Sequence, residues 1–367
     1  MPVTRSQAAR HTRIPLAGGG QETLLSEIGF VLLPLFSTAE ACALRLVCRE
    51  FLAAVAEHPW EDRDTVIHGS IAAWRACFPR ALCANVEQGE EEDEDGGTNS
   101  PGSMYWTFRR RARLVDADFV HFEGLRELNM AGCVDVTDAA FAHLRGIQKL
   151  FMSYCDQDEL TDAAFASLRG IHTLHMNRCR QDGITDAAFA HLRGIHSLNI
   201  RFCRQAGITD AAFAHLRGIH TLNMSGCKQA GITDAAFAHL RGIHTLNMSG
   251  CSQAGITDAA FAHLRGIHTL HMMHCSQEGI TDAAFVHLRG VHTLDISFLH
   301  QAGITEGAFR HLRGVHVLNM FTDRPFFTGA ALVHLQGACA VGISPCHVDL
   351  RAAASSLGLH VGKCRCR

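Results

Sequence analysis

Long apolar runs are missing from this sequence. No run approaches the roughly 18 residues that a transmembrane helix needs, and residues 1–20 lack the apolar stretch of a secretory signal. We therefore predict a soluble intracellular protein, cytoplasmic or nuclear, with no membrane partner. In those compartments its 15 cysteines are expected to be reduced thiols.

A charge excess of either sign is missing as well. The chain has 33 Lys and Arg against 36 Asp and Glu, which gives a formal net charge of −3. Bulk electrostatics therefore does not favour nucleic acid as a partner, and an aromatic content of 7% supplies few rings on which bases could stack. Partners have to be sought in local patches of the surface.

Motifs of catalysis are also missing. The sequence contains no phosphate-binding loop, no dinucleotide-binding glycine pattern and no HExxH zinc motif. No nucleophile is arranged against a base. We predict a protein that is not an enzyme and that has no cofactor and no metal site.

Repetition is what the sequence has in abundance. The phrase GITDAAFAHLRGIHTLNMSGC, residues 231–251, belongs to a unit that repeats every 24 residues, seven times between Ile147 and Val315. A fixed period of this length is typical of a solenoid, because each unit has an apolar face that only its neighbours can bury.

Each unit divides into a strand half and a helix half. Leu246 and Met248 alternate with polar residues, which predicts a short strand with two side chains facing inward. Phe237 and Leu240 then share one face of a short helix, and Thr233 is suited to be its N-cap.

The spacing I-x-x-L-x-L-x-x-C in these units resembles the leucine-rich repeats of F-box proteins, in which a Cys takes the place of the usual Asn. The resemblance covers residues 114–350. It implies an α/β fold, a leucine-rich-repeat solenoid shaped as a right-handed horseshoe, with a parallel sheet on the concave face and short helices on the convex face.

Polar residues recur in columns along the repeats. The Asp column that begins at Asp138 fits helix starts, and the Cys column that begins at Cys133 fits small buried thiols. Two His columns, which begin at His143 and His172, fit solvated ladders; a metal-dependent function is the alternative, but parallel rings do not converge on an ion. Because His titrates near pH ~6.5, we predict a loss of stability below about pH 6.

The units differ most on the concave face and in the loop after each strand, where a solenoid presents its binding surface. Residue types that anchor protein interfaces gather there. We predict that a protein with acidic and apolar features binds to Phe151, Tyr154, His175, Asn177, Arg178, Arg201, Phe202, Met273, His274, Phe298 and Phe321. Drift of duplicated repeats without selection is the alternative.

Residues 21–62 contain two amphipathic helical patterns and predict a small all-α bundle. The segment resembles an F-box through its L-x-x-E-I opening, its LRLVCREF helix and its closing Trp, although the usual initial Leu-Pro pair is missing. The resemblance implies docking to the adaptor of a cullin-RING (SCF-type) ubiquitin ligase through Leu24, Leu25, Ile28, Leu46, Val47, Phe51 and Trp60. The chain would then be the ligase's substrate-recognition subunit; a stand-alone binding module, with helices that only cap the solenoid, is the alternative.

Composition divides the rest of the chain. Residues 1–20 are predicted to be a disordered tail, 63–86 a linker helix and the start of the solenoid, and 351–367 a C-terminal cap and tail. Residues 87–113 combine an acidic run with a basic run and are predicted to be a disordered insertion.

Overall fold

The computed structural model describes residues 32–47, 49–67, 69–86, 114–299, 301–322 and 327–362. The predicted tail 1–20, the insertion 87–113 and the F-box positions Leu24, Leu25 and Ile28 lie outside these residues. No helix in the described ranges is long and apolar enough to cross a bilayer.

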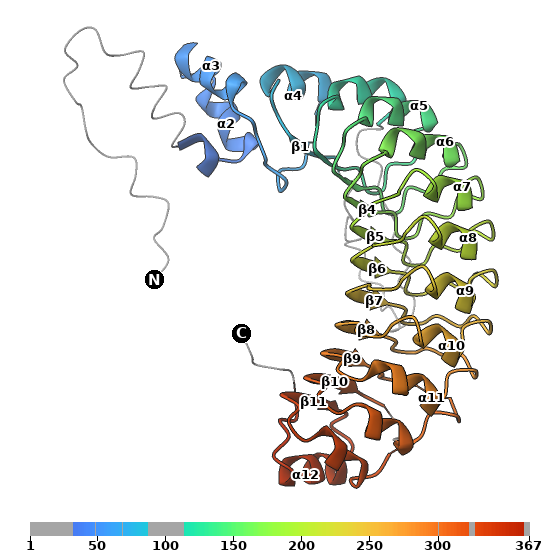
Figure 1. The fold of residues 1–367 in the computed structure, drawn as a ribbon. Helices are drawn as coiled ribbons and strands as arrows, with labels where there is room; N and C mark the ends of the chain where they lie inside the picture. The colour runs from blue at the N-terminus through green and yellow to red at the C-terminus, as the bar shows by residue number, and fades with distance from the viewer. Residues whose placement is uncertain are drawn as a thin grey trace, which may run out of the picture.

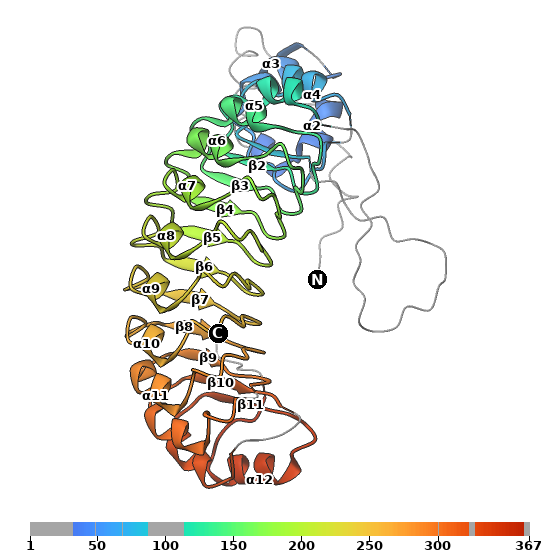
Figure 2. The same cartoon turned by 90° about the vertical axis from the view of Figure 1, so that its right-hand side faces the viewer.

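One parallel sheet of 11 strands, in chain order, organises the described residues. The strands lie on the inner side of a curved stack and the short helices on its outer side (Figure 1), and Figure 2 shows the strands following one another along the stack. The strands are β1 (Cys83–Asn85), β2 (Glu127–Asn129), β3 (Lys149–Phe151), β4 (Thr173–His175), β5 (Ser197–Asn199), β6 (Thr221–Asn223), β7 (Thr245–Asn247), β8 (Thr269–His271), β9 (Thr293–Asp295), β10 (Val317–Met320) and β11 (Ala340–Ile343).

The convex helices are short, as predicted. They are η3 (Asp116–Phe122), α5 (Asp138–Phe141), η4 (Ala142–Leu144), α6 (Asp162–Phe165), η5 (Ala166–Leu168), α7 (Asp186–Phe189), α8 (Asp210–Phe213), α9 (Asp234–Phe237), α10 (Asp258–Phe261), α11 (Asp282–Phe285), η6 (Val286–Leu288), η7 (Glu306–His311) and η8 (Ala331–Leu335). In α9, Thr233 is the N-cap, and its side chain accepts a hydrogen bond from the N–H of Ala235.

Among the described residues, the first strand is preceded by η2 (Leu33–Leu35), α2 (Thr38–Leu44), α3 (Arg49–Glu57) and α4 (Ile71–Cys77). Strand β1 lies upstream of the segment 114–350 that the sequence assigned to repeats, and it pairs in parallel with β2. The N–H of Leu82 donates to the carbonyl of Trp60 at 2.8 Å. The segment that follows α3 is therefore joined to the first strand of the sheet.

Each repeat gives apolar side chains at equivalent positions to one continuous core. Phe237, at the end of α9, and Leu246, in β7, are fully buried. Burying a side chain of this size contributes about 1.5–3 kcal/mol, but a lone repeat has nothing that covers it. The stability of each unit therefore depends on its two neighbours.

Carboxylates join consecutive repeats on the helical side. Asp234, the first residue of α9, accepts hydrogen bonds from the N–H of Thr257 at 2.7 Å and from its Oγ1 hydroxyl at 2.6 Å. The Asp column thus adds an inter-repeat contact to the helix-start role that the sequence indicated. The same contact joins Asp116 to Thr137, Asp138 to Thr161, Asp162 to Thr185, Asp186 to Thr209, Asp210 to Thr233, Asp258 to Thr281 and Asp282 to Thr305.

The predicted role of the Cys column as buried thiols is confirmed. Cys203 is fully buried, and its Sγ donates to the carbonyl of Met176 in the preceding repeat at 3.1 Å. Burial raises the pKa of Cys155, Cys203 and Cys275 to about 12. Nucleophilic attack and metal ligation both need the thiolate, so this environment favours packing over chemistry.

A buried column of Gln residues was not predicted. Gln205 is 1% exposed, and its Nε2 donates to the carbonyl of Cys179 in the preceding repeat at 3.0 Å. Gln157, Gln181, Gln229, Gln253, Gln277 and Gln301 are buried as well. The loops nest against each other closely enough to enclose these amides.

The C-terminal end of the stack is covered by α12 (Val348–Ser356), which packs Leu350 and Ala354 against the last coil. A parallel bridge joins Val341 to Val361. Cys339 is disulfide-bonded, so the expectation of reduced thiols is wrong at this position, although the other cysteines of the described residues are free.

We predict that Asp234→Ala lowers the free energy of unfolding by about 1–3 kcal/mol, because two buried or half-buried donors of Thr257 lose a charged acceptor. Asp234→Asn keeps one acceptor oxygen and is expected to cost less. Urea unfolding followed by circular dichroism measures both.

Asp182→Ala is the control, because Asp182 is exposed and lies in a loop outside the Asp column. Equal destabilisation by Asp182→Ala and Asp234→Ala would show that the inter-repeat contact adds nothing beyond the loss of a charge.

Candidate interaction surface

The strands present alternate side chains on the concave face of the sheet. Phe151 of β3 lies opposite His175 of β4, and the two rings make an edge-to-face contact with centroids 4.8 Å apart. Burial in this contact region lowers the pKa of His175. Asn177 accepts a hydrogen bond from the hydroxyl of Ser153. Phe151, His175 and Asn177, three of the predicted binding residues, therefore lie in adjacent repeats.

The remaining predicted positions on the strand side are Arg201, Met273 and Phe321. Arg201 is exposed, and Met273 and Phe321 are half-buried. The carbonyl of Phe321 accepts the N–H of Phe298 at 2.7 Å, which places these two aromatic residues in adjacent repeats at the C-terminal end of the surface.

One position after each of the strands β2 to β9 has left-handed backbone geometry. Gly226 and Gly250 have φ values of 69° and 68° there. The N–H of Gly226 donates to the carbonyl of Ser249 at 2.8 Å, as the equivalent N–H does in the other repeats, so pairing with the next coil fixes this conformation. Glycine is the residue that adopts it without strain.

Five repeats place a large side chain at this left-handed position. They are Tyr154 (φ 60°), Arg178 (φ 60°), Phe202 (φ 57°), His274 (φ 57°) and Phe298 (φ 55°), and we call them the left-handed row. Each costs about 1 kcal/mol or more relative to glycine. All five were predicted binding residues, but their strain was missed; Gly132, Gly226 and Gly250 at equivalent positions were the signal.

Aromatic and cationic side chains of the row contact one another. The guanidinium carbon of Arg178 lies 5.3 Å from the ring centroid of Tyr154 and 4.9 Å from that of Phe202. Arg201 approaches the same Phe202 ring at 4.6 Å. Further along the stack, the rings of His274 and Phe298 are parallel, with centroids 4.6 Å apart. Two clusters result, separated by the repeats that carry Gly226 and Gly250.

No protein-family model and no curated protein matches this sequence. Solved structures do match its fold. The Drosophila Toll–Spatzle complex aligns with a TM-score of 0.52 at 14% identity, over 78% of this chain and 36% of that chain. The TLR13–ssRNA13 complex aligns with a TM-score of 0.50 at 17% identity, over 62% of this chain and 34% of that chain.

The fold is a leucine-rich-repeat solenoid. The parallel sheet and the strand–helix period agree with this likeness. The chain spans about a third of the length of the two matched chains, and identities this low concern the fold alone.

In this leucine-rich-repeat solenoid the His columns lie on the surface as ladders. The imidazoles at the strand entry stack with ring centroids 4.4–4.6 Å apart: His172, His196, His220, His244, His268, His292 and His316. On the helical side, Nδ1 of His215 accepts from the Arg193 guanidinium of the preceding repeat at 3.3 Å. Within the described residues, no three His, Cys, Asp or Glu side chains are grouped to hold a metal ion.

The described F-box-like positions have different environments. Leu46 and Val47, in the turn after α2, are 88% and 65% exposed, and Phe51 of α3 is half-buried. Trp60 is 1% exposed, and its Nε1 donates to the carbonyl of Val55 at 2.8 Å. The prediction for Trp60 is corrected: its side chain packs inside the N-terminal helices and is not available to a docking partner.

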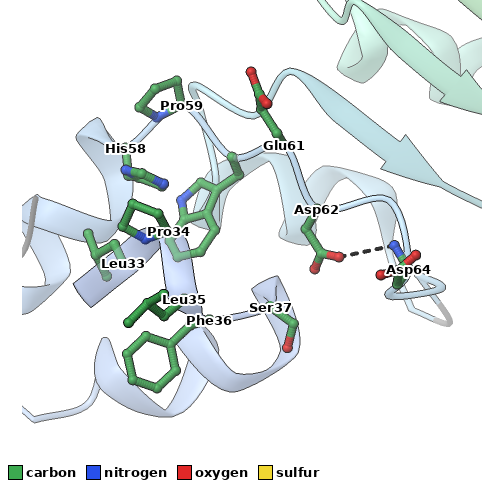
Figure 3. A pocket seen from close by; sticks show the side chains of 11 residues that line it. Leu33, Pro34, Leu35, Phe36, Ser37, His58, Pro59, Glu61, Asp62 and Asp64 are labelled. Carbon is green, nitrogen blue, oxygen red and sulfur yellow. Dashed lines mark hydrogen bonds between the residues drawn. The ribbon is translucent and has the colours of Figure 1, made fainter. Parts of the chain in front are cut away.

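A pocket of about 410 Å³ lies beside these helices, between residues 33–37 and residues 58–64. Figure 3 shows Leu33, Pro34 and Phe36 on one side and the carboxylates of Glu61 and Asp62 on the other. Burial acts to raise the pKa of Asp62, but hydrogen bonds from Thr38 and Thr65 outweigh it and lower this pKa. Asp62 therefore holds the start of α2 to the segment after α3.

We predict that acid destabilises the solenoid through the stacked His ladder. Burial, and then the neighbouring imidazoles, lower the pKa of His220 and of His292. The unfolded chain, with pKa values near ~6.5, then binds protons more readily than the folded one, so stability is fully present above that pH and is lost as the pH falls through the folded pKa values. Thermal unfolding measured between about pH 7.5 and 5 tests this.

The double variant His220→Gln plus His292→Gln is expected to show a shallower fall in unfolding temperature with acid than the native chain. A native unfolding temperature that stays constant down to about pH 5 would contradict the prediction.

Proposed function

We propose that this chain is a protein-binding scaffold, and that its finer role is substrate recognition for a cullin-RING (SCF-type) ubiquitin ligase. The left-handed row carries the first part of the proposal. Backbone strain persists where a function uses the side chain that causes it. Glycine would satisfy the backbone at all five positions, so packing alone does not account for Tyr154, Arg178, Phe202, His274 and Phe298.

A protein ligand agrees with the composition of this surface. Tyr, Phe, Met and Arg are enriched at the cores of protein interfaces, and the aromatic clusters are spaced along a rigid sheet. One matched structure holds Toll with Spatzle and the other holds TLR13 with ssRNA13. The net charge of −3 and the sparse aromatic residues favour a protein over RNA here.

The scaffold would act by rigid positioning. Residues of the sheet are held by parallel pairing on both sides, so a bound target keeps a constant orientation relative to the N-terminal helices. In the ligase role these helices bind the adaptor, and the concave face offers a lysine of the target to a conjugating enzyme carried by other subunits. Catalysis then belongs to the partners.

Exposed apolar side chains support adaptor docking. Leu46, Val47 and Leu35 are 88%, 65% and 73% exposed, and apolar surface of this kind marks interaction sites. Helix α2 is itself well formed, because Ser37 and Glu40 make a reciprocal capping box. The turn that carries Leu46 and Val47 therefore follows directly on a well-capped helix.

A cap for the solenoid is the second candidate for the N-terminal helices. The burial of Trp60 and the bond from Leu82 to its carbonyl favour it, because both tie this segment to the first strand. The two roles are compatible in space, since capping uses the buried side chains and docking would use Leu46 and Val47.

Affinity purification from cells tests the ligase role. We expect the native chain to recover a cullin and its adaptor, and Leu46→Asp plus Val47→Asp to lose both, because two charges would be buried in the docking interface. Val286→Asp, at an apolar residue 49% exposed on the convex side, is the matched control and should keep both. Absence of cullin and adaptor from a folded native bait would leave the cap as the role of these helices.

Glycine substitution tests the concave surface. We predict that His274→Gly plus Phe298→Gly leaves the unfolding free energy unchanged or raises it by about 1 kcal/mol, because backbone strain is relieved, while recovery of target proteins falls. A variant that unfolds more easily and still recovers its targets would indicate that these rings serve packing.

A further inference from the structure

The guanidinium group of Arg178 is held by aromatic rings. It lies over the rings of Tyr154 and Phe202, and within the described residues neither Arg178 nor Arg201 contacts a carboxylate. Ring faces bind the flat side of a guanidinium and leave the N–H groups at its edge free to donate. Because the rings already restrict the Arg178 side chain, binding an anion costs less side-chain conformational entropy than it would at a mobile arginine.

The ring of Phe202 keeps its place because the next repeat has no side chain beneath it. A Cβ on Gly226 would overlap the ring carbons Cδ1 and Cε1 of Phe202. At the equivalent Gly250, the nearest atoms to such a Cβ belong to the Gly226 backbone, 3.8 Å away. Phe202 therefore lies across Gly226, and its ring centroid is 4.9 Å from the guanidinium carbon of Arg178 and 4.6 Å from that of Arg201.

Further cations lie in the loops after strands β4, β5 and β6. Arg180, Arg204 and Lys228 occupy one loop position in consecutive repeats and are exposed. The acids in these loops and in the preceding loop after β3 are Asp156, which accepts the backbone N–H of Arg180 at 3.1 Å, Asp158, Glu159 and Asp182. Five cations, Arg178, Arg180, Arg201, Arg204 and Lys228, therefore lie beside four acids, whereas acids outnumber Lys and Arg in the whole chain.

We infer that Arg178 and Arg201 bind the phosphoryl group of a phosphorylated Ser or Thr in an extended segment of the target protein. This inference rests on the proposed protein-binding function of the concave face and names the chemistry that the face recognises. A phosphoryl dianion offers three acceptor oxygens, which suits two guanidinium groups better than a single carboxylate does. Apolar side chains of the segment would contact Tyr154 and Phe202.

Degenerate peptide libraries on beads provide the probe, with a central residue fixed as phosphoserine, glutamate or serine. We expect the full-length chain to be retained about tenfold more on the phosphoserine library than on the other two. Arg178→Gly should abolish this preference and unfold no more easily than the native chain, because glycine suits the left-handed backbone. Equal retention on the glutamate and phosphoserine libraries would overturn the phosphoryl assignment.

Gly226→Ala and Gly250→Ala form a matched pair, because both glycines have the same backbone geometry and both variants carry the same strain. Only Gly226→Ala displaces the Phe202 ring, so it should weaken phosphoserine retention, whereas Gly250→Ala should not. Equal effects of the two variants, or none from Arg178→Gly, would contradict the inference.

Two further outcomes separate this inference from the proposed function. Recovery of cellular targets that is unchanged by phosphatase but lost in Phe202→Gly would leave the scaffold role standing and refute phosphoryl recognition. Retention of a single-stranded oligouridine that depends on Arg178 would instead identify RNA as the ligand. Binding of cullin and adaptor is expected to be unaffected by every variant of this site.

Discussion

The rest of the structure depends on the contact between the Asp that starts each convex helix and the Thr that caps the next one. Asp234 accepts both donors of Thr257, and Thr257 in turn caps α10. Helix start and repeat spacing are thus set by one pair of residues. A helix of four residues has little stability of its own, so this tie to the neighbouring coil is what holds it in position.

The regular spacing of the convex helices is matched by the strands, the buried thiols and the stacked imidazoles. Strands pair in the same register from β3 to β9, thiols reach the carbonyl of the preceding coil, and imidazoles stack at 4.4–4.6 Å. A ladder of His rings is therefore a consequence of the fold's period rather than a site. Function has to be sought where the repeats depart from each other.

The sequence predicted the features that repeat with the period of 24 residues, but not those that arise from the close packing of neighbouring loops. The strand–helix unit and the buried Cys column followed from repeated letters, because equivalent residues of a solenoid share one environment. The Gln column did not, because a polar residue in a loop is normally exposed, and only the close approach of neighbouring loops buries Gln205. The docking role of Trp60 came from a resemblance alone, which did not indicate its burial against residues such as Phe78, whose ring centroid lies 5.5 Å from that of Trp60.

The left-handed row shows how a uniform scaffold can acquire a specific surface. Its backbone geometry is fixed by pairing with the next coil, so a bulky residue at this position cannot relax by changing φ and is presented in one orientation. Gly226 has two roles. It adopts the left-handed conformation of its own repeat without strain, and its lack of a side chain leaves space for the ring of Phe202 from the preceding repeat. Glycine and aromatic residues in one column are therefore complementary parts of a surface. Their order along the solenoid determines which repeats present a bulky side chain for contact with a ligand.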